Sequence, residues 1–249
     1  MTNKQNKIAI VTGGASGIGR AIAGKFVESH ITTIIIGRDV NKLAAAKNQL
    51  GKLCIPVSFD LNDLQAFPKL IAQIINEHGT IDILVNNAGI NLKKEFTAVT
   101  DEEFQKIMLT NVTAMFALSR EVVKWMIQKT SGSIINISSM ASQYGIPKVI
   151  AYSASKAAIE GMTRAMAVEL SPMGVRVNCI APGFIATDMS AKALDNDEER
   201  RVKVMSRTPM GALGLPSDIA DAALFLASAA SAYITGVVLP VDGGNSIGF

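Results

Sequence analysis

The fold is decided by the stretch Thr12-Gly13-Gly14-Ala15-Ser16-Gly17-Ile18-Gly19, which separates the apolar run 8–11 from a segment with helical spacing at 20–27. Glycine permits a tight turn and a close approach of backbone N–H groups to a bound group, and a helix N-terminus adds partial positive charge. This order of strand, turn and helix favours a phosphate cradle, with a purely structural turn as the alternative. The spacing G-x-x-x-G-x-G differs from the G-x-G-x-x-G of the common dinucleotide fingerprint.

The rest of the chain alternates short, β-branched apolar runs with longer stretches of helical spacing. Most of the runs are continuously apolar, which is typical of strands covered on both faces in a parallel sheet. The predicted strands are 8–11, 32–36, 53–57, 83–85, 133–137, 175–179 and 237–241, and the clearest helical segments are 64–75, 104–125, 157–170 and 219–226. We predict an α/β fold: a single-domain, Rossmann-type, doubly wound parallel sheet of about seven strands with helices on both faces.

No linker, repeat or low-complexity segment divides the chain, so one domain over 1–249 is expected. The one long irregular stretch lies between Pro182 and Pro216, and its charged cluster Asp195–Arg201 indicates a solvated helix face. A long excursion after a strand end is often a lid. We therefore predict a substrate lid at about 183–215.

Composition excludes several classes of protein. A chain of 249 residues that is 49% hydrophobic can bury a core without disulfides or a metal, and a net charge of +3 from scattered residues gives no basic block for nucleic acid. Cys54 and Cys179 lie far apart without a CxxC pattern, so we expect two core thiols and no metal site. The uncharged segment 222–241 is broken by Gly236 and Pro240, which favours a helix and a buried strand over a membrane span. With a polar N-terminus and no signal-peptide pattern, a cytoplasmic protein is expected.

The end of the second predicted strand, Ile36-Gly37-Arg38-Asp39, bears on which dinucleotide is bound. An acidic residue about 20 positions after the glycine turn typically holds the ribose hydroxyls of NAD, and Asp39 has roughly that offset. Gly37, however, opens space, and Arg38 can hold a 2′-phosphate with its planar guanidinium while Asp39 caps the next helix. We expect NADP(H), with NAD(H) as the alternative. Asp60, after the third strand, is expected at the adenine edge or as the N-cap of the next helix.

Tyr152 and Lys156 are four residues apart, so on a helix they share a face. A nearby ammonium favours the phenolate and lowers the pKa of a tyrosine from about 10, which gives a proton donor and acceptor usable near neutral pH. A tyrosine stacked on a lysine stem is the structural alternative. Ser139 and the segment Asn86–Gly89 each follow a predicted strand, where ligand sites of open α/β sheets lie.

Taken together, these segments resemble the short-chain dehydrogenases/reductases over nearly the whole chain. The matching pieces are TGGASGIG at 12–19, Asn86-Asn87-Ala88-Gly89, Asn111, Ser139, Tyr152-x-x-x-Lys156, and Pro182-Gly183 with Thr187. Each piece is weak alone, but their order and spacing make the combination specific.

The resemblance implies a catalytic role for four residues. Tyr152 would be the acid/base on the substrate oxygen, Lys156 would lower its pKa and hold the nicotinamide ribose, and Ser139 would hydrogen-bond the carbonyl. Asn111 would support a water that links Lys156 to solvent. Ile185 and Thr187 would contact the nicotinamide carboxamide. The full set of implied cofactor contacts is Gly13, Ser16, Gly17, Ile18, Gly19, Arg38, Asp60, Leu61, Asn87, Ala88, Gly89, Tyr152, Lys156, Pro182, Gly183, Ile185 and Thr187.

The expected activity is NADP(H)-dependent hydride transfer between a ketone and a secondary alcohol. The segments 91–94 and 146–149 look closer to gluconate-5-dehydrogenase-type members, and Lys93 or Lys148 could attract the carboxylate of a sugar acid such as 5-ketogluconate; two solvated lysines are the alternative. A 3-oxoacyl-[acyl-carrier-protein] reductase is the other close relative. Such reductases tend to present arginines near the site mouth, and Thr130 and Met173 stand at the matching positions here, a departure that weakens this alternative.

Two further classes of protein share some of these features. A nonenzymatic NADP(H)-sensing protein would be supported by loss of Ser139, Tyr152 or Lys156, and all three are present. Nucleotide-sugar epimerases and dehydratases usually have a longer chain with a substrate domain. The resemblance also implies a homotetramer, in which helices 104–125 and 157–170 pair across one interface and the last strand with the tail 243–249 completes another. The alternative is that the apolar faces of these helices only cover the sheet.

Overall fold

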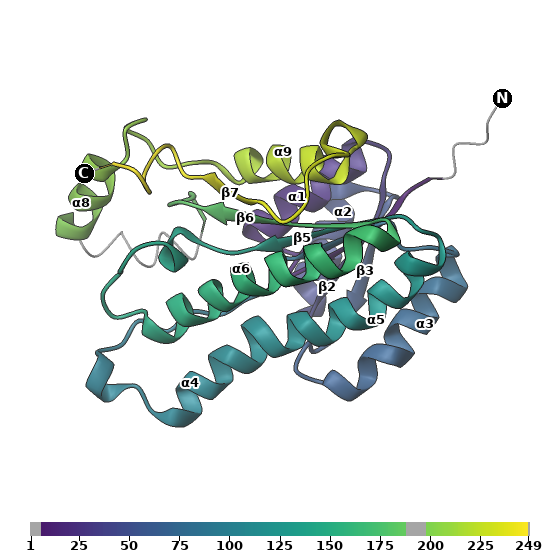
Figure 1. Cartoon of the computed structure of the whole chain (residues 1–249), viewed down its shortest axis with the longest axis horizontal. Helices are drawn as coiled ribbons and strands as arrows, with labels where there is room; N and C mark the ends of the chain where they lie inside the picture. The colour runs from purple at the N-terminus through teal and green to yellow at the C-terminus, as the bar shows by residue number, and fades with distance from the viewer. Residues whose placement is uncertain (1–5, 188–197, 249) are drawn as a thin grey trace.

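The computed structural model describes residues 6–187 and 198–248. Its centre is a parallel, seven-stranded sheet in the order β3-β2-β1-β4-β5-β6-β7 (Figure 1). The strands are β1 (Ile8–Thr12), β2 (Thr32–Gly37), β3 (Cys54–Ser58), β4 (Ile83–Asn86), β5 (Gly132–Ile137), β6 (Val175–Pro182) and β7 (Val238–Val241). The helices are α1 (Gly17–Glu28), α2 (Val40–Leu50), α3 (Phe67–His78), α4 (Asp101–Met108), α5 (Ala114–Gln128), α6 (Ile150–Leu170), α8 (Glu198–Arg207) and α9 (Pro216–Ala227). The doubly wound α/β fold is therefore confirmed.

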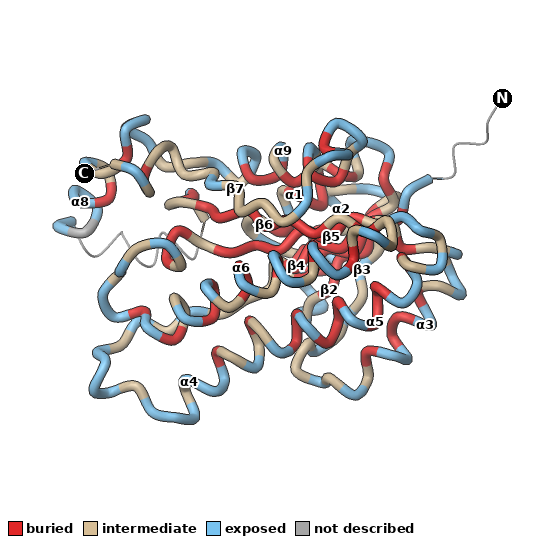
Figure 2. The backbone as a smooth tube through the Cα atoms, viewed as in Figure 1, coloured by how far each residue is buried: buried red, intermediate tan, exposed pale blue. Residues whose placement is uncertain are grey.

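Consecutive residues of the central strands face opposite layers of helices. Ile34 and Ile36 of β2 belong to the core beneath α3, α5 and α6, whereas Ile35 packs against α1 and α2. A third core joins β1, β4, β5 and β6 to α1 and α9. Because both faces are covered, the strands carry continuous apolar runs, and they form the buried centre in Figure 2.

The strand order reverses beside β1, because β2 and β4 flank it on its two sides. A crevice forms at such a point, outside the carboxyl ends of the strands. The turns after β1, β4, β5 and β6 all end at this edge. The fold thus brings together residues that are far apart in the sequence.

The predicted helix 104–125 lies within a helical segment that runs from Asp101 to Gln128. A capping box between Thr100 and Glu103 starts α4 at Asp101, and a π-helical turn over Leu109–Thr113 separates it from α5. The predicted helix 64–75 begins as a 3-10 turn, and Pro68 in the first turn of α3 sets the start of the α-helix at Phe67. The helix predicted at 157–170 starts earlier, at Ile150, so it includes Tyr152 and Lys156.

The predicted lid at 183–215 lies partly outside the described residues, which omit 188–197. Its two ends meet where Ile185 pairs with Gly214 in an isolated parallel bridge. The helix expected around Asp195–Arg201 is described only from Glu198, as α8.

Within the described residues, no helix is both long and apolar enough to cross a membrane. Cys54 and Cys179 are buried free thiols, as expected. No group of three or more His, Cys, Asp or Glu side chains in that part of the chain could hold a metal ion.

Candidate active site

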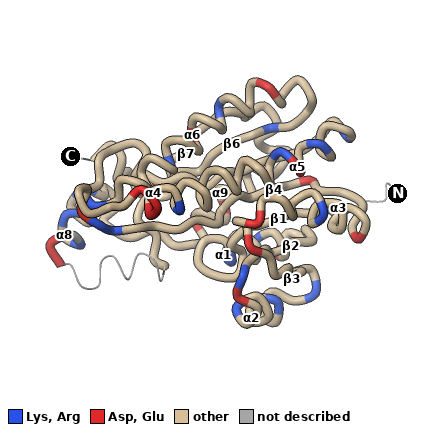
Figure 3. The backbone as a smooth tube through the Cα atoms, turned by 90° about the horizontal axis from the view of Figure 1, so that it is seen from below, with Lys and Arg blue, Asp and Glu red and all other residues tan. Residues whose placement is uncertain are grey.

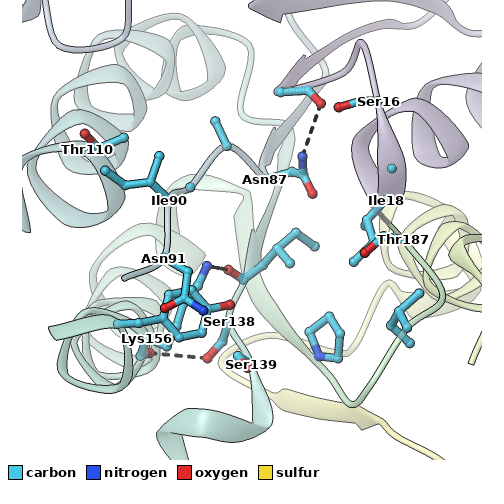
Figure 4. A pocket seen from close by; sticks show the side chains of 18 of the residues that line it. Ser16, Ile18, Asn87, Ile90, Asn91, Thr110, Ser138, Ser139, Lys156 and Thr187 are labelled. Carbon is cyan, nitrogen blue, oxygen red and sulfur yellow. Dashed lines mark hydrogen bonds between the residues drawn. The ribbon is translucent and has the colours of Figure 1, made fainter. Parts of the chain in front are cut away.

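A cavity of about 450 Å³ lies at the carboxyl edge of the sheet. Ser16, Ile18 and Thr187 line one side, Ile90 and Thr110 the other, and Ser138, Ser139 and Lys156 lie together at one end (Figure 4). Of the predicted site residues, the cavity is lined by Gly13, Ser16, Gly17, Ile18, Arg38, Asp60, Leu61, Asn87, Ala88, Gly89, Ser139, Tyr152, Lys156, Pro182, Gly183, Ile185 and Thr187. Gly19 and Asn111 do not line it.

The glycine turn adopts the conformations that favour glycine. Gly13 and Gly17 have φ angles of +66° and +51°, in the left-handed region. Ser16, the N-cap of α1, makes no side-chain cap, and the first turn of the helix carries no acidic residue. Backbone donors at this helix start are thus available to an anion, which fits the pyrophosphate of a dinucleotide.

Gly19 packs against the turn and the side chain of Asn87 and does not line the cavity. A side chain there would collide with the carbonyl of Gly13 and the amide of Asn87. Close packing of the helix against the turn therefore requires glycine here. A contact of Gly19 with the cofactor stays a prediction.

Thr12 organises this edge of the sheet, although sequence reasoning did not single it out. Its hydroxyl accepts hydrogen bonds from the backbone N–H groups of Asn87 (3.0 Å) and Ala88 (3.1 Å) and lies 3.3 Å from the carbonyl oxygen of Val85. The side-chain amide of Asn87 donates back to the carbonyl of Thr12 at 3.0 Å. The turns after β1 and β4 are thereby fixed to each other. The only signal in the sequence is a threonine at the end of a predicted strand, directly before the glycine turn.

Arg38 and Asp39 have separate surroundings. The Asp39 carboxylate accepts from the backbone N–H groups of Asn41 and Lys42, both at 3.0 Å, so it caps α2 as predicted. Arg38 lines the cavity, is exposed, and makes no ion pair within the described residues. Asp60 also lines the cavity and accepts from the backbone of Asn62. The N-cap of the next turn is Asp63, so the alternative that Asp60 is that N-cap is wrong.

Tyr152 and Lys156 face the same cavity from α6, with the lysine Nζ 5.4 Å from the centre of the tyrosine ring. Burial raises the pKa of the Tyr152 phenol, and a hydrogen bond with Ser139 acts in the opposite direction. Burial also lowers the pKa of Lys156 to about 8. The structure does not give the expected depression of the tyrosine pKa by the lysine: burial raises this pKa, and the opposing effect comes from Ser139.

Asn111 lies in the π-helical turn between α4 and α5 and is buried. Its side-chain amide donates to the carbonyl of Ile90 (2.9 Å) and to the hydroxyl of Ser155 (3.0 Å), and its oxygen accepts from the Ile90 N–H at 2.8 Å. Ser155 in turn donates to the carbonyl of Tyr152 at 2.7 Å. Asn111 therefore connects the segment after β4 to the helix that carries Tyr152.

The cavity is also lined by apolar side chains. Side chains that sequence reasoning did not assign line it: Ile90, Met140, Ile146, Val149 and Phe184. No periodic pattern marks them, because they come from loops after β4, β5 and β6.

Lys93 and Lys148 are the residues expected to attract a carboxylate. Lys148 lies next to an acidic residue, and so does Lys94, the neighbour of Lys93. Lys148 Nζ lies 2.7 Å from Glu95, and Lys94 Nζ lies 2.8 Å from Glu103. Figure 3 shows both signs of charge around α4, which carries Glu103. The charge of these two lysines is thus largely balanced within the chain.

Thr130 and Met173 do not lie near the cavity of their own chain. Thr130 precedes the start of β5, and Met173 precedes the start of β6, so both lie at the edge of the sheet opposite the cavity. Within one chain, Thr130 and Met173 are therefore too far from the cavity for their identity to count against a carrier-protein reductase.

Comparison with known proteins agrees with this geometry. A family model of short-chain dehydrogenases, described as Enoyl-(Acyl carrier protein) reductase, matches residues 13–246. The chain is 41% identical over 242 residues to a 3-oxoacyl-[acyl-carrier-protein] reductase of Vibrio harveyi, covering 97% of this chain and 98% of that one. It is 42% identical over 245 residues to a 3alpha-hydroxysteroid dehydrogenase of Mediterraneibacter gnavus, covering 96% of each.

A solved structure described as a putative gluconate dehydrogenase from Agrobacterium tumefaciens is also similar. It is 34% identical, has a TM-score of 0.93, and covers 98% of this chain and 97% of its own. The chain belongs to the short-chain dehydrogenase/reductase family, whose members are NAD(P)-dependent oxidoreductases that act on CH–OH groups.

Proposed function

We propose that this protein is an NADP(H)-dependent ketoreductase whose substrate is an apolar ketone of the 3-oxoacyl thioester class. The observation that carries the proposal is one cavity with two different ends. One end holds the glycine turn and Arg38, and the other holds Ser139, Tyr152 and Lys156 amid apolar side chains. The first end suits an anionic dinucleotide and the second suits a carbonyl.

The cofactor end fits the phosphorylated dinucleotide. Arg38 offers an exposed guanidinium at the end of β2 beside Gly37, and the planar fork of donors suits a 2′-phosphate. Asp39, which would hold the ribose hydroxyls of NAD, is engaged at the start of α2. When bound, the cofactor supplies the hydride.

Tyr152 and Ser139 interact with the carbonyl oxygen of the substrate. Tyr152 donates its phenolic proton to that oxygen as negative charge develops there, and the Ser139 hydroxyl donates a second hydrogen bond to the same atom. A phenol whose pKa is raised by burial is fully protonated at neutral pH, which is the form that reduction requires. Lys156, whose pKa is lowered to about 8, can supply a proton to Tyr152 after Tyr152 has donated its own.

The choice of substrate class rests on the lining of the cavity. Several side chains that line the cavity together with Tyr152 are apolar, and Lys148 is paired with Glu95, so an acyl chain suits this cavity better than a sugar acid. Relatives named as 3-oxoacyl-[acyl-carrier-protein] reductases support the same class. The keto group of a 3-oxoacyl thioester would lie against Ser139 and Tyr152.

A sugar acid such as 5-ketogluconate is the second candidate. Lys93, Lys94 and Lys148 come together because the backbone of Lys94 donates to the carbonyl of Lys148 at 2.7 Å. The structural neighbour described as a putative gluconate dehydrogenase favours this class.

The test is a screen of 3-oxoacyl thioesters against keto-sugar acids, each with NADPH and with NADH. We expect the highest kcat/KM with a 3-oxoacyl thioester and NADPH. Faster turnover of the keto-sugar acids would overturn the thioester assignment. Tight binding of NADPH without turnover of any ketone would instead indicate a nonenzymatic sensor.

We also propose a homotetramer. The outer surface of α4, α5 and α6 carries exposed apolar side chains that a partner could cover, namely Phe104, Phe116, Trp125, Ile150 and Val168. Exposed patches of this kind are typical of interfaces between subunits. Light scattering of the wild type should give four chains, and Phe116→Asp should give smaller species.

A further inference from the structure

We infer that Glu160 is a positioning residue that holds the loop of Ser139 against α6, so that Ser139 and Tyr152 reach the same carbonyl oxygen. The inference rests on the proposed function, in which these two side chains act together. Glu160 itself lies behind the site and does not line the cavity.

Glu160 is a buried carboxylate without a cationic partner in the described part of the chain. It is 8% exposed, and its Oε1 accepts a 2.8 Å hydrogen bond from the hydroxyl of Ser138. The hydroxyl of Ser142 also lies within hydrogen-bond distance of that oxygen. Removing a carboxylate from water is costly, so its retention here requires these donors.

The two serines stand on either side of Ser139. The hydroxyl of Ser142 also lies 2.5 Å from the backbone carbonyl of Ser139, and that of Ser138 lies 3.3 Å from the carbonyl of Lys156. One carboxylate oxygen thereby fixes the loop at two points that bracket the Ser139 side chain. Figure 4 shows Ser138 and Ser139 side by side next to Lys156.

The position of Glu160 on α6 ties this loop to the proton donor. Tyr152, Lys156 and Glu160 are spaced by four residues, so they share one face of the helix. Lys156 from the same helix and Cys179 from β6 are the titratable groups nearby, and the Glu160 carboxylate helps to raise the pKa of Cys179. A rigid link between α6 and the loop fixes the separation of the Ser139 and Tyr152 hydroxyls.

The experiment compares Glu160→Ala, Ser142→Ala, the double variant and Glu160→Gln. We expect each alanine variant to lower kcat by about tenfold, because a small displacement of a positioning group is costly, with KM much less affected. The dissociation constant of NADPH should be unchanged, since the glycine turn and Arg38 are untouched. The double variant should be no worse than either single one. Glu160→Gln keeps an acceptor oxygen and should recover most of kcat.

Thr163→Val is the matched control. Thr163 is buried on the same helix, but it accepts from Asn136 on β5 and does not touch the serine loop. This variant should lose thermal stability while keeping kcat. If Glu160→Ala behaves like Thr163→Val, Glu160 is a structural residue and the inference is wrong.

A readout without turnover separates this inference from the proposed function. The Ser139 hydrogen bond lowers the pKa of Tyr152, so a displaced loop should raise it. Ultraviolet titration of tyrosinate, with Tyr152→Phe subtracted, should show this upward shift in Glu160→Ala and not in Glu160→Gln. An unchanged Tyr152 pKa would overturn the inference even if no substrate is found. A shifted Tyr152 pKa in Glu160→Ala, with no turnover of any ketone by the wild type, would support the positioning role of Glu160. The same result would count only against the proposed ketoreductase activity.

Discussion

The ammonium of Lys156 donates a 2.7 Å hydrogen bond to the backbone carbonyl of Ile137, the last residue of β5. Both residues are buried, and Lys156 is only 4% exposed. The lysine side chain is thus held at the carboxyl edge of the sheet by a neutral acceptor, without a carboxylate partner in the described residues. Its lowered pKa follows from this burial.

Lys156→Met should therefore stabilise the unliganded protein at pH 7 while abolishing activity. Holding a buried ammonium costs about 1–3 kcal/mol in the free energy of unfolding, and methionine removes that cost. Chemical denaturation of the wild type and the variant at pH 7 measures the difference. A variant less stable than the wild type would show that the Ile137 hydrogen bond outweighs desolvation.

The same lysine predicts a pH dependence of stability. A lysine with a pKa of about 8 when folded, against 10.5 ordinarily, binds fewer protons in the folded than in the unfolded chain between these pH values. The wild type should therefore gain stability relative to Lys156→Met as the pH rises from 8 to 10. Burial raises the pKa of Tyr152, and it raises that of Cys179 from 9.0 to about 12, so both groups lower the stability as the pH rises. They do so in both proteins, and their contribution cancels in the difference between the wild type and Lys156→Met. A constant difference between the two proteins would contradict the lowered pKa.

Tyr152→Phe should reduce kcat by about 10³-fold, because the proton donor to the carbonyl oxygen is lost. Binding of NADPH should be nearly unchanged, since the ring remains and only the hydroxyl is removed. Steady-state kinetics with a fluorescence titration of NADPH gives both quantities. Tyr233→Phe is the control, because that side chain is fully exposed. Turnover at the wild-type rate would mean that another group supplies the proton.

The sequence predicts the strands and the edge where the site lies, because continuous apolar runs and glycine turns are local signals. Ser139, Tyr152 and Lys156 were found in the same way, from their places after a strand and on one helix face. The π-helical turn at Leu109–Thr113 was not predictable from spacing, since apolar periodicity continues across it. The pairing of Lys148 with Glu95, and of Glu160 with two serines, depends on loops meeting in three dimensions. Burial of Tyr152 likewise reversed a pKa direction that spacing alone suggested.

Arg176→Ala should destabilise the protein by about 2–3 kcal/mol, since the Arg176 guanidinium is partly buried and donates hydrogen bonds to backbone carbonyl oxygens. It donates to Leu226 at the end of α9 (2.8 Å) and to Ile234 before β7 (3.3 Å). Burial lowers its pKa, and no carboxylate of the described residues pairs with it. Thermal unfolding measures the loss, with the exposed Lys52→Ala as a control. A loss of stability no larger than that of Lys52→Ala would show that the hydrogen bond from Arg176 to the end of α9 does not stabilise the fold.

Arg38→Asp should shift the preference from NADP(H) toward NAD(H), because it removes the cation near the 2′-phosphate and places a carboxylate near the ribose hydroxyls. We expect the ratio of kcat/KM for NADPH over NADH to fall by at least about tenfold, in line with the loss of one charged hydrogen-bonding group. Arg20→Asp makes the same change of charge on α1, where Arg20 contacts Gln49 and does not line the main cavity. That control separates a local contact from a general electrostatic effect. Equal responses of the two variants, or an unchanged ratio in Arg38→Asp, would assign the choice of cofactor to other residues.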